Sequence, residues 1–465
     1  MSLQLLIKNG VCVNADGEFA GDVGIQDGKI VILGQDLEVQ AERTIDAQGN
    51  YILPGLIDAH VHLPWPSAKA SSVDDYGSGT AAAICGGVTT TIEYVVPDET
   101  GSIIPALENQ ARNARNASYA DFAFHLIINK VTDKTPSDMR EAVRRGVVSF
   151  KIYTAYSGFR LGDDDILNVL ATAKDLNALV CFHAEDGLMI NFATQRLVEK
   201  GQTDISFYPD AHPKGVDAEI TYRMIQYARH TGARIHIVHV NTKEAAQMIG
   251  AARRNGQMVT GETCPQYLMF TEDVFKSGKT EANYFVCAPL MRTAEDRQGL
   301  WDALAKNELQ MVASDHCPYT SAQKLEGKGD FRNIPGGLAG VETSLPILYT
   351  YGVCKGRFPI ERLVAVMAAN PAKIFNIYPK KGAISIGSDA DLVIFNSQTK
   401  WKIDVAGLHS KIDHTVYQGM EVVGRPVSTI LRGEIVVQNN QIVARKPGGE
   451  LIKRERYPEA VTSLD

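Results

Sequence analysis

The stretch Gly-Leu-Ile-Asp-Ala-His-Val-His, residues 55–62, decides how the rest of the chain is interpreted. It has the pattern of an apolar strand that ends in two histidines separated by one residue. Because side chains on a strand alternate between its faces, His60 and His62 point the same way, and two imidazoles on one face can hold a metal ion. Asp58 shares that face and could support them through a hydrogen bond. The motif is short, and a pair of structural histidines explains it equally well at this point.

The composition is ordinary for a soluble globular protein. The 465 residues are 45% hydrophobic and 22% charged, with a formal net charge of -7, and no run is dense in Lys and Arg. We therefore expect neither nucleic acid nor a membrane as a partner. The N-terminus lacks the apolar core of a signal peptide, and no long apolar window predicts a transmembrane helix. Seven scattered cysteines without a Cys-x-x-Cys pair favour free thiols and a cytoplasmic location.

The two ends of the chain have the same β-rich character. Short strand-like runs punctuated by turns fill residues 1–52 and recur at residues 382–444. Each end is short for a sandwich of about 100 residues. We therefore favour one composite β-sandwich, built from residues 1–52 and 379–465 with a C-terminal tail, over two separate β modules.

The central region, residues 53–378, alternates apolar strands with segments of helical spacing. Eight candidate strands lie at residues 56–62, 88–95, 122–128, 147–153, 179–183, 234–239, 258–263 and 311–315. Eight strands that alternate with helices predict an α/β fold, a (β/α)8 TIM-type barrel.

Chemistry in such a barrel lies at the C-terminal ends of the strands, and the polar residues there form a set. They are His60, His62, Lys151, His183, His239 and Asp315. Four imidazoles and a carboxylate exceed what one zinc ion needs, so two ions joined by a bridging anion are one interpretation. A buried lysine is pushed towards its neutral amine, and this amine could add carbon dioxide to become such a bridge. Taken alone, Lys151 is more simply interpreted as a structural lysine paired with an acid.

Two further histidines are expected to lie outside this set. His236 has the opposite strand parity to His239, so we expect it to face the helices. His212 lies in a polar context, and we expect it to be solvated.

At these residues the chain resembles the cyclic amidohydrolases, most closely the dihydropyrimidinase and hydantoinase branch. The resemblance covers nearly the whole chain and includes the segments DAHVH (58–62), SFKIYTAY (149–156), HAE (183–185), IVHV (237–240), GETCPQY (261–267), SDHCP (314–318) and NPAKIF (370–375). It implies a barrel, a β-sandwich from both termini and two divalent ions, commonly zinc. It also implies that carboxylated Lys151 bridges the ions. His60, His62 and Asp315 would join it on one ion, and His183 and His239 on the other.

The resemblance implies a hydrolase that opens the ring of 5,6-dihydropyrimidines or hydantoins to N-carbamoyl amino acids. In such an enzyme a hydroxide held between the ions would attack the ring carbonyl. Asp315 would transfer the proton to the leaving nitrogen, and Tyr156 would donate a hydrogen bond to the developing oxyanion. Side chains expected to form an apolar pocket for the ring substituent are Leu63, Trp65, Tyr153 and Phe159. Segments expected to bind the ring through backbone groups contain Cys287, Ala288, Gly336 and Gly337.

Other functions stay open. Dihydroorotases have an arginine next to the His-x-His motif, where Leu63 stands here, and allantoinases commonly lack a tyrosine at the position of Tyr156. However, Ala288 replaces a frequent serine and Gly336 a frequent asparagine, and an allantoinase also tolerates the glycine. Relatives that act only as scaffolds have lost the metal ligands, whereas all six positions are filled here. The resemblance also suggests a homotetramer.

Overall fold

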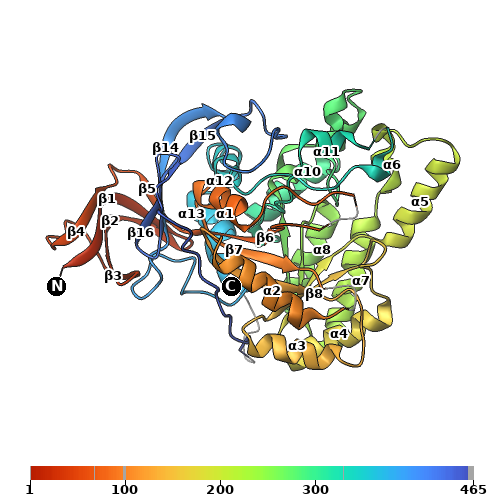
Figure 1. The fold of residues 1–465 in the computed structure, drawn as a ribbon, viewed down its shortest axis with the longest axis horizontal. Coiled ribbons are helices and arrows are strands. Elements are labelled where there is room, and N and C mark those ends of the chain that lie inside the picture. The colour runs from red at the N-terminus through yellow and green to blue at the C-terminus, as the bar shows by residue number, and fades with distance from the viewer. Residues whose placement is uncertain (1, 67–68, 98–100, 328, 459–465) are drawn as a thin grey trace.

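The computed structural model describes residues 2–66, 69–97, 101–327 and 329–458. Figure 1 shows a barrel wrapped by helices, with a separate twisted sheet beside it that contains the N-terminal strands and late strands of the chain. Within the described ranges, no helix combines the length and apolar character needed to cross a membrane.

The barrel is made of eight parallel strands that pair in chain order. They are β6 (Leu56–Val61), β7 (Val88–Val95), β8 (Asp121–Ile127), β9 (Ser149–Tyr153), β10 (Leu179–His183), β11 (Arg234–Ile237), β12 (Val259–Thr263) and β13 (Met311–Val312). A parallel bridge between Val61 and His316 links the two ends of this sheet, and His62 N–H donates to the His316 carbonyl over 2.9 Å. The predicted fold class is therefore confirmed, although several strands end earlier than expected.

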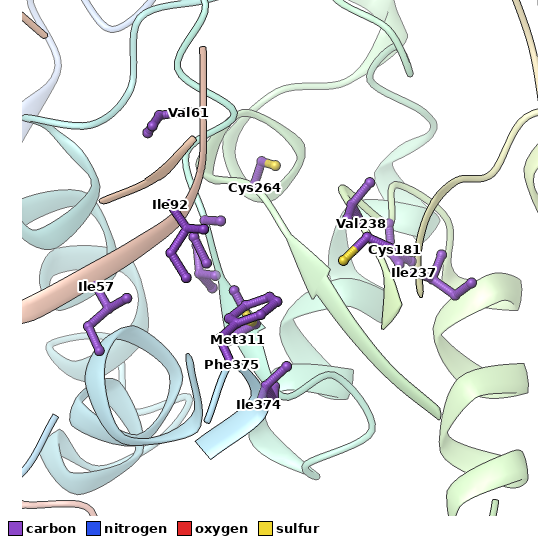
Figure 2. Close-up of a cluster of buried hydrophobic side chains, with 14 of the residues drawn as sticks. Ile57, Val61, Ile92, Cys181, Ile237, Val238, Cys264, Met311, Ile374 and Phe375 are labelled. Carbon is purple, nitrogen blue, oxygen red and sulfur yellow. The ribbon is translucent and has the colours of Figure 1, made fainter. Parts of the chain in front are cut away.

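The barrel strands are apolar because both of their faces are covered. Every residue of β7 and β8 is buried, as expected for a parallel sheet enclosed by helices. Figure 2 shows part of the resulting core, with Ile57 of β6, Ile92 of β7, Met311 of β13 and Phe375 among its members.

Helices connect the strands and surround the barrel (Figure 1). The α-helices are α1 (Tyr76–Cys85), α2 (Ile103–Arg115), α3 (Thr135–Arg144), α4 (Asp163–Asp175), α5 (Gly187–Glu199), α6 (Tyr208–Ala211), α7 (Val216–Thr231), α8 (Lys243–Arg254), α9 (Pro265–Met269), α10 (Ala294–Ala305), α11 (Ser321–Leu325), α12 (Ser344–Leu348), α13 (Ile360–Val364) and α14 (Asn370–Ile374). Short 3-10 segments lie at Ile205–Phe207, Glu272–Lys276, Thr280–Phe285, Phe331–Asn333 and Val405–Gly407, and π-helical segments at Tyr349–Val353 and Ala365–Ala369.

The second sheet joins both ends of the chain. Its strands are β1 (Leu3–Asn14), β2 (Gly17–Gln26), β3 (Lys29–Gly34), β4 (Ala41–Asp46), β5 (Tyr51–Pro54), β14 (Leu392–Lys402), β15 (Glu421–Leu431), β16 (Glu434–Gln438) and β17 (Gln441–Ile442). The antiparallel pairing of β5 with β14 places Leu53 opposite Val393 and unites the two halves. One sheet from both termini is thus observed, while the domain limits at residues 52 and 378 stay a prediction.

A buried lysine forms ion pairs that link the barrel to the terminal sheet. Lys381 Nζ lies 2.6 Å from carboxylate oxygens of Asp121 and Asp391 and 2.9 Å from one of Asp389. Asp121 is the first residue of barrel strand β8, whereas Asp391 directly precedes β14. The position of the barrel relative to the sheet is therefore fixed by charged groups as well as by apolar packing.

Candidate metal centre and substrate pocket

Three of the predicted ligands meet at the mouth of the barrel. His60 lies near the end of β6, His62 directly follows this strand, and Asp315 follows β13. The Nε2 atoms of both histidines lie 3.2 Å from the same Asp315 oxygen, Oδ1. All three residues are buried, and one donor atom from each lies within 4.8 Å of the others. This is a donor set with the size and chemistry of a divalent metal site.

His183 and His239 form the neighbouring part of the cluster. His183 Nδ1 lies 2.8 Å from His239 Nε2, and the ring centroids of His239 and His60 are 5.3 Å apart. Burial lowers the pKa values of His60 and His239 well below the usual range for histidine. Their imidazoles are therefore neutral at physiological pH, which is the form that binds metals.

Lys151 lies in the floor of this cluster. It is fully buried, and its ammonium is 4.7 Å from the ring centroid of Tyr94 and 5.2 Å from that of Tyr153. Burial lowers the pKa of the Lys151 ammonium to about 8. Within the described ranges no group forms a hydrogen bond with Lys151 Nζ, so the alternative of a structural lysine paired with an acid is not observed. A buried amine without a hydrogen-bond partner among these residues is compatible with a modified ligand.

Two buried carboxylates form hydrogen bonds with ring nitrogens of the predicted ligand histidines. Glu262 Oε1 accepts from His60 Nδ1 over 2.5 Å, and its Oε2 lies 3.1 Å from His236 Nε2. Glu185 acts in the same way on His183, whose Nε2 lies 2.8 Å from Glu185 Oε2. Each carboxylate fixes a ring tautomer, so that the other ring nitrogen keeps its lone pair for a metal. Sequence reasoning did not identify either acid as a support.

The structure corrects two expectations about histidines. His236 does not face the helices, because its ring contacts the Glu262 carboxylate inside the barrel. His212 is not solvated: it is buried, and its Nδ1 lies 2.9 Å from Glu185 Oε1. Asp58 supports the motif as expected, but through the backbone, since its Oδ1 accepts from His60 N–H over 3.2 Å.

Three site residues have left-handed backbone conformations. The φ values are 70° at Tyr156, 39° at His239 and 53° at Asp315. Residues with a Cβ rarely adopt such values, and backbone strain of this kind is concentrated at functional sites. Tyr156 is 38% exposed, and its hydroxyl donates to Glu185 Oε2 over 2.9 Å. The predicted oxyanion donor thus lies at the edge of the cluster, beside His183.

Three of the four predicted pocket side chains group together. Trp65 stacks on Phe159 at 5.7 Å between centroids, and Phe159 lies 5.2 Å from Tyr153. Trp65 also contacts the ring of His62 at 4.6 Å, so this aromatic group adjoins the metal cluster. Leu63 is separate from it, because its side chain packs against Gly79 of helix α1.

The two predicted backbone segments lie side by side. Gly337 N–H donates to the Val286 carbonyl over 3.0 Å, and a Cβ at Gly336 would lie 3.8 Å from Ala288 N. The second segment is also held beside the turn that carries Asp315, because Cys317 N–H donates to Leu338 O over 2.9 Å. Cys287, Ala288, Gly336 and Gly337 are therefore brought together, while their role in binding the ring stays a prediction.

Comparison with known proteins gives matches over almost the entire chain. Residues 51–436 match the model of the amidohydrolase family. The chain is 36% identical to D-hydantoinase of Geobacillus stearothermophilus over 463 residues, covering 99% of this chain and 98% of the relative. It is 33% identical to dihydropyrimidinase of Rattus norvegicus over 467 residues, covering 98% and 90%.

Solved structures give the same result. The crystal structure of a D-hydantoinase matches with a TM-score of 0.95 at 37% identity, covering 97% of this chain and 99% of that chain. L-hydantoinase (dihydropyrimidinase) from Arthrobacter aurescens matches with a TM-score of 0.91 at 30% identity, covering 97% and 100%. The similarity therefore includes the terminal sheet as well as the barrel.

Proposed function

Because this chain belongs to the amidohydrolase family, we propose that it is a binuclear metal hydrolase that opens the ring of hydantoins or 5,6-dihydropyrimidines to N-carbamoyl amino acids. The observation that carries the proposal is the convergence of strand-end ligands at the barrel mouth. His60, His62 and Asp315 meet there, and a second histidine pair adjoins them. The names of the relatives, D-hydantoinase and dihydropyrimidinase, give the class of substrate.

The proposed metal ions are zinc. His60, His62 and Asp315 would hold one ion, His183 and His239 the other, and Lys151 would bridge them as a carbamate formed with carbon dioxide. The Lys151 amine, which has no hydrogen-bond partner among the residues that the structure describes, and the neutral imidazoles support this assignment. Bound divalent ions would act as Lewis acids, which strengthens the acidity of water and withdraws charge from a carbonyl oxygen.

The protein's own groups supply proton transfer and orientation. Asp315 is a buried carboxylate whose Oδ1 faces both His60 and His62; it would accept the proton of the attacking water and return it to the ring nitrogen as the amide bond breaks. Tyr156 would redirect its hydroxyl from Glu185 to the carbonyl oxygen, on which negative charge develops. The aromatic group around Trp65 would hold the ring substituent and exclude water.

We also propose that the protein is a homotetramer and that it is cytoplasmic. An inactive scaffold is disfavoured because all six ligand positions carry metal-binding residue types. Size-exclusion chromatography with light scattering tests the tetramer; a monomer at micromolar concentration would contradict it.

A metal analysis combined with a substrate panel tests the function. The purified protein is expected to contain two metal ions per chain and to hydrolyse dihydrouracil or 5-substituted hydantoins faster than allantoin or dihydroorotate. A His239→Ala variant should lose metal and activity, whereas His230→Ala, on the outer helix α7, should retain both. Turnover of allantoin or dihydroorotate alone would contradict the substrate class, and a metal-loaded protein without turnover of any ring would contradict the reaction.

The carbamate has its own test. After exchange with carbon-13-labelled bicarbonate, the wild-type protein should show a carbamate resonance in its carbon-13 NMR spectrum that Lys151→Ala lacks. Identical spectra of the two proteins would exclude the modification.

A further inference from the structure

A second fully buried lysine lies outside the metal cluster. Lys324, on helix α11, has no exposed surface, and within the described ranges it forms no ion pair with an acid. Burial lowers the pKa of its ammonium to about 7. Removing a cation from water without an ion-pair partner is unfavourable, so other contacts must replace its hydration.

The contacts of Lys324 lie on the two substrate-binding segments. Its Nζ donates to the Val286 carbonyl over 2.6 Å and to the Pro335 carbonyl over 2.8 Å. Its remaining side faces the ring of Tyr319, 5.5 Å from the centroid. One side chain therefore connects the residue before Cys287 with the residue before Gly336. A neutral amine also has two N–H donors, so both contacts persist in either protonation state.

These contacts orient two peptide groups. The Val286 carbonyl belongs to the same peptide unit as Cys287 N–H, and the Pro335 carbonyl to the same unit as Gly336 N–H. Because C=O and N–H of a trans peptide point in opposite directions, both N–H groups are directed away from Lys324. Neither N–H donates to another group in the part of the chain that the structure describes. Two oriented donors without an internal acceptor remain free for a ligand.

Neighbouring contacts place these donors at the barrel mouth. Tyr208 donates its hydroxyl to the Cys287 carbonyl over 2.8 Å, and Tyr208 packs on His212, which bonds to Glu185 behind the metal cluster. A Cβ at Gly336 would have no neighbour nearer than 3.8 Å. Gly336 is exposed, and the Cys287 segment is linked to the metal cluster through Tyr208 and His212.

We propose that Lys324 is a positioning residue, which holds the peptide groups of Cys287 and Gly336 so that their N–H groups receive carbonyl oxygens of the cyclic substrate. This inference rests on the proposed function. The lysine also withdraws electron density from the two carbonyls, which strengthens the N–H donors of the same peptide units. Lys324 itself does not touch the substrate.

Substitution of Lys324 by methionine tests the proposal, because methionine fills a similar volume without donors. Lys324→Met should raise KM for the best ring substrate by about tenfold or more, while kcat changes by less than about threefold, since the lost contacts bind substrate and transition state alike. Metal content should stay at the wild-type value. Ser321→Ala is the matched control, because it removes the side-chain hydrogen bond from α11 to Asp413 and leaves both segments untouched; its KM should not change.

Hydrogen exchange gives a readout independent of turnover. In Lys324→Met, peptides covering residues 285–290 and 333–338 should exchange faster than in the wild type, whereas residues 54–62 should not change. Lys324→Gln keeps a donor on a shorter side chain, so its KM and its exchange rates should lie between those of the wild type and Lys324→Met. This variant replaces Lys324→Met in the test if the methionine variant does not fold. Unchanged KM together with unchanged exchange in a folded variant would overturn the proposal. A wild type that hydrolyses no ring would refute the proposed function, while the exchange comparison would still decide the role of Lys324.

Discussion

Replacement of Glu262 by glutamine tests how much this carboxylate contributes to metal affinity through its hydrogen bond with His60. The carboxylate accepts from His60 Nδ1 over 2.5 Å and lies 3.1 Å from His236 Nε2. An amide offers only one acceptor oxygen, so it cannot accept from both rings as the carboxylate can. Loss of such a support typically lowers metal affinity about 10- to 100-fold, or about 1.4 to 2.8 kcal/mol. We expect Glu262→Gln to lie in this range.

The assay is competitive titration of the metal-free protein with zinc in the presence of a chromophoric chelator. Glu93→Gln is the matched control: Glu93 is equally buried in the barrel, but its oxygens accept from backbone N–H groups of Leu63 and Tyr94 over 2.7 and 3.0 Å. This variant should bind zinc within about threefold of the wild type, because it touches no ring nitrogen. A folded Glu262→Gln protein with wild-type zinc affinity would refute the assigned role of this carboxylate.

Three further outcomes follow from the structure. Tyr156→Phe should lower kcat about 10²- to 10³-fold with unchanged metal content, as for loss of one oxyanion donor; an unchanged kcat would exclude that role. Gly337→Ala should abolish folding or ring binding, because its Cβ would lie 2.3 Å from a backbone oxygen, whereas Gly336→Ala should retain activity. The pKa of His409 is raised by its hydrogen bond with Glu342, so its stabilising effect is complete at low pH and is lost as pH rises through the raised value. The thermal midpoint of His409→Gln should therefore fall furthest below that of the wild type near pH 5, and a deficit that grows with pH would contradict this.

The barrel and the ligand set were predictable because each depends on a short-range pattern. Apolar runs such as β8 need no partner to be identified, and the ligands follow directly at strand ends. The parity argument failed at His236 because β11 ends at Ile237 and His239 turns into a left-handed conformation with φ of 39°. Alternation between faces holds only while the backbone stays extended.

The groups that support the site could not be predicted from the sequence, because their hydrogen-bond partners are distant in the chain. Glu262 bonds to His60 across 202 residues, and Lys324 bonds to Val286 across 38 residues. An acid or a lysine in an amphipathic context has the same local pattern whether it is solvated or buried. Only the closed barrel shows which of these groups lose their water and so must find a partner.

The metal ligands lie on barrel strands and the substrate-binding residues lie on connecting segments. This difference explains why the type of reaction can be inferred more sharply than the substrate. His60, Lys151 and His183 lie on paired strands of the barrel, where neighbouring strands fix their spacing. Ala288 and Gly336 lie in connecting segments, positioned by side chains such as Lys324, and loops vary more freely than the scaffold beneath them. A change in these segments can alter which ring fits while leaving the ligand set intact. The substrate panel should therefore separate this chain from relatives with the same metal ligands, and the differences should appear first in KM.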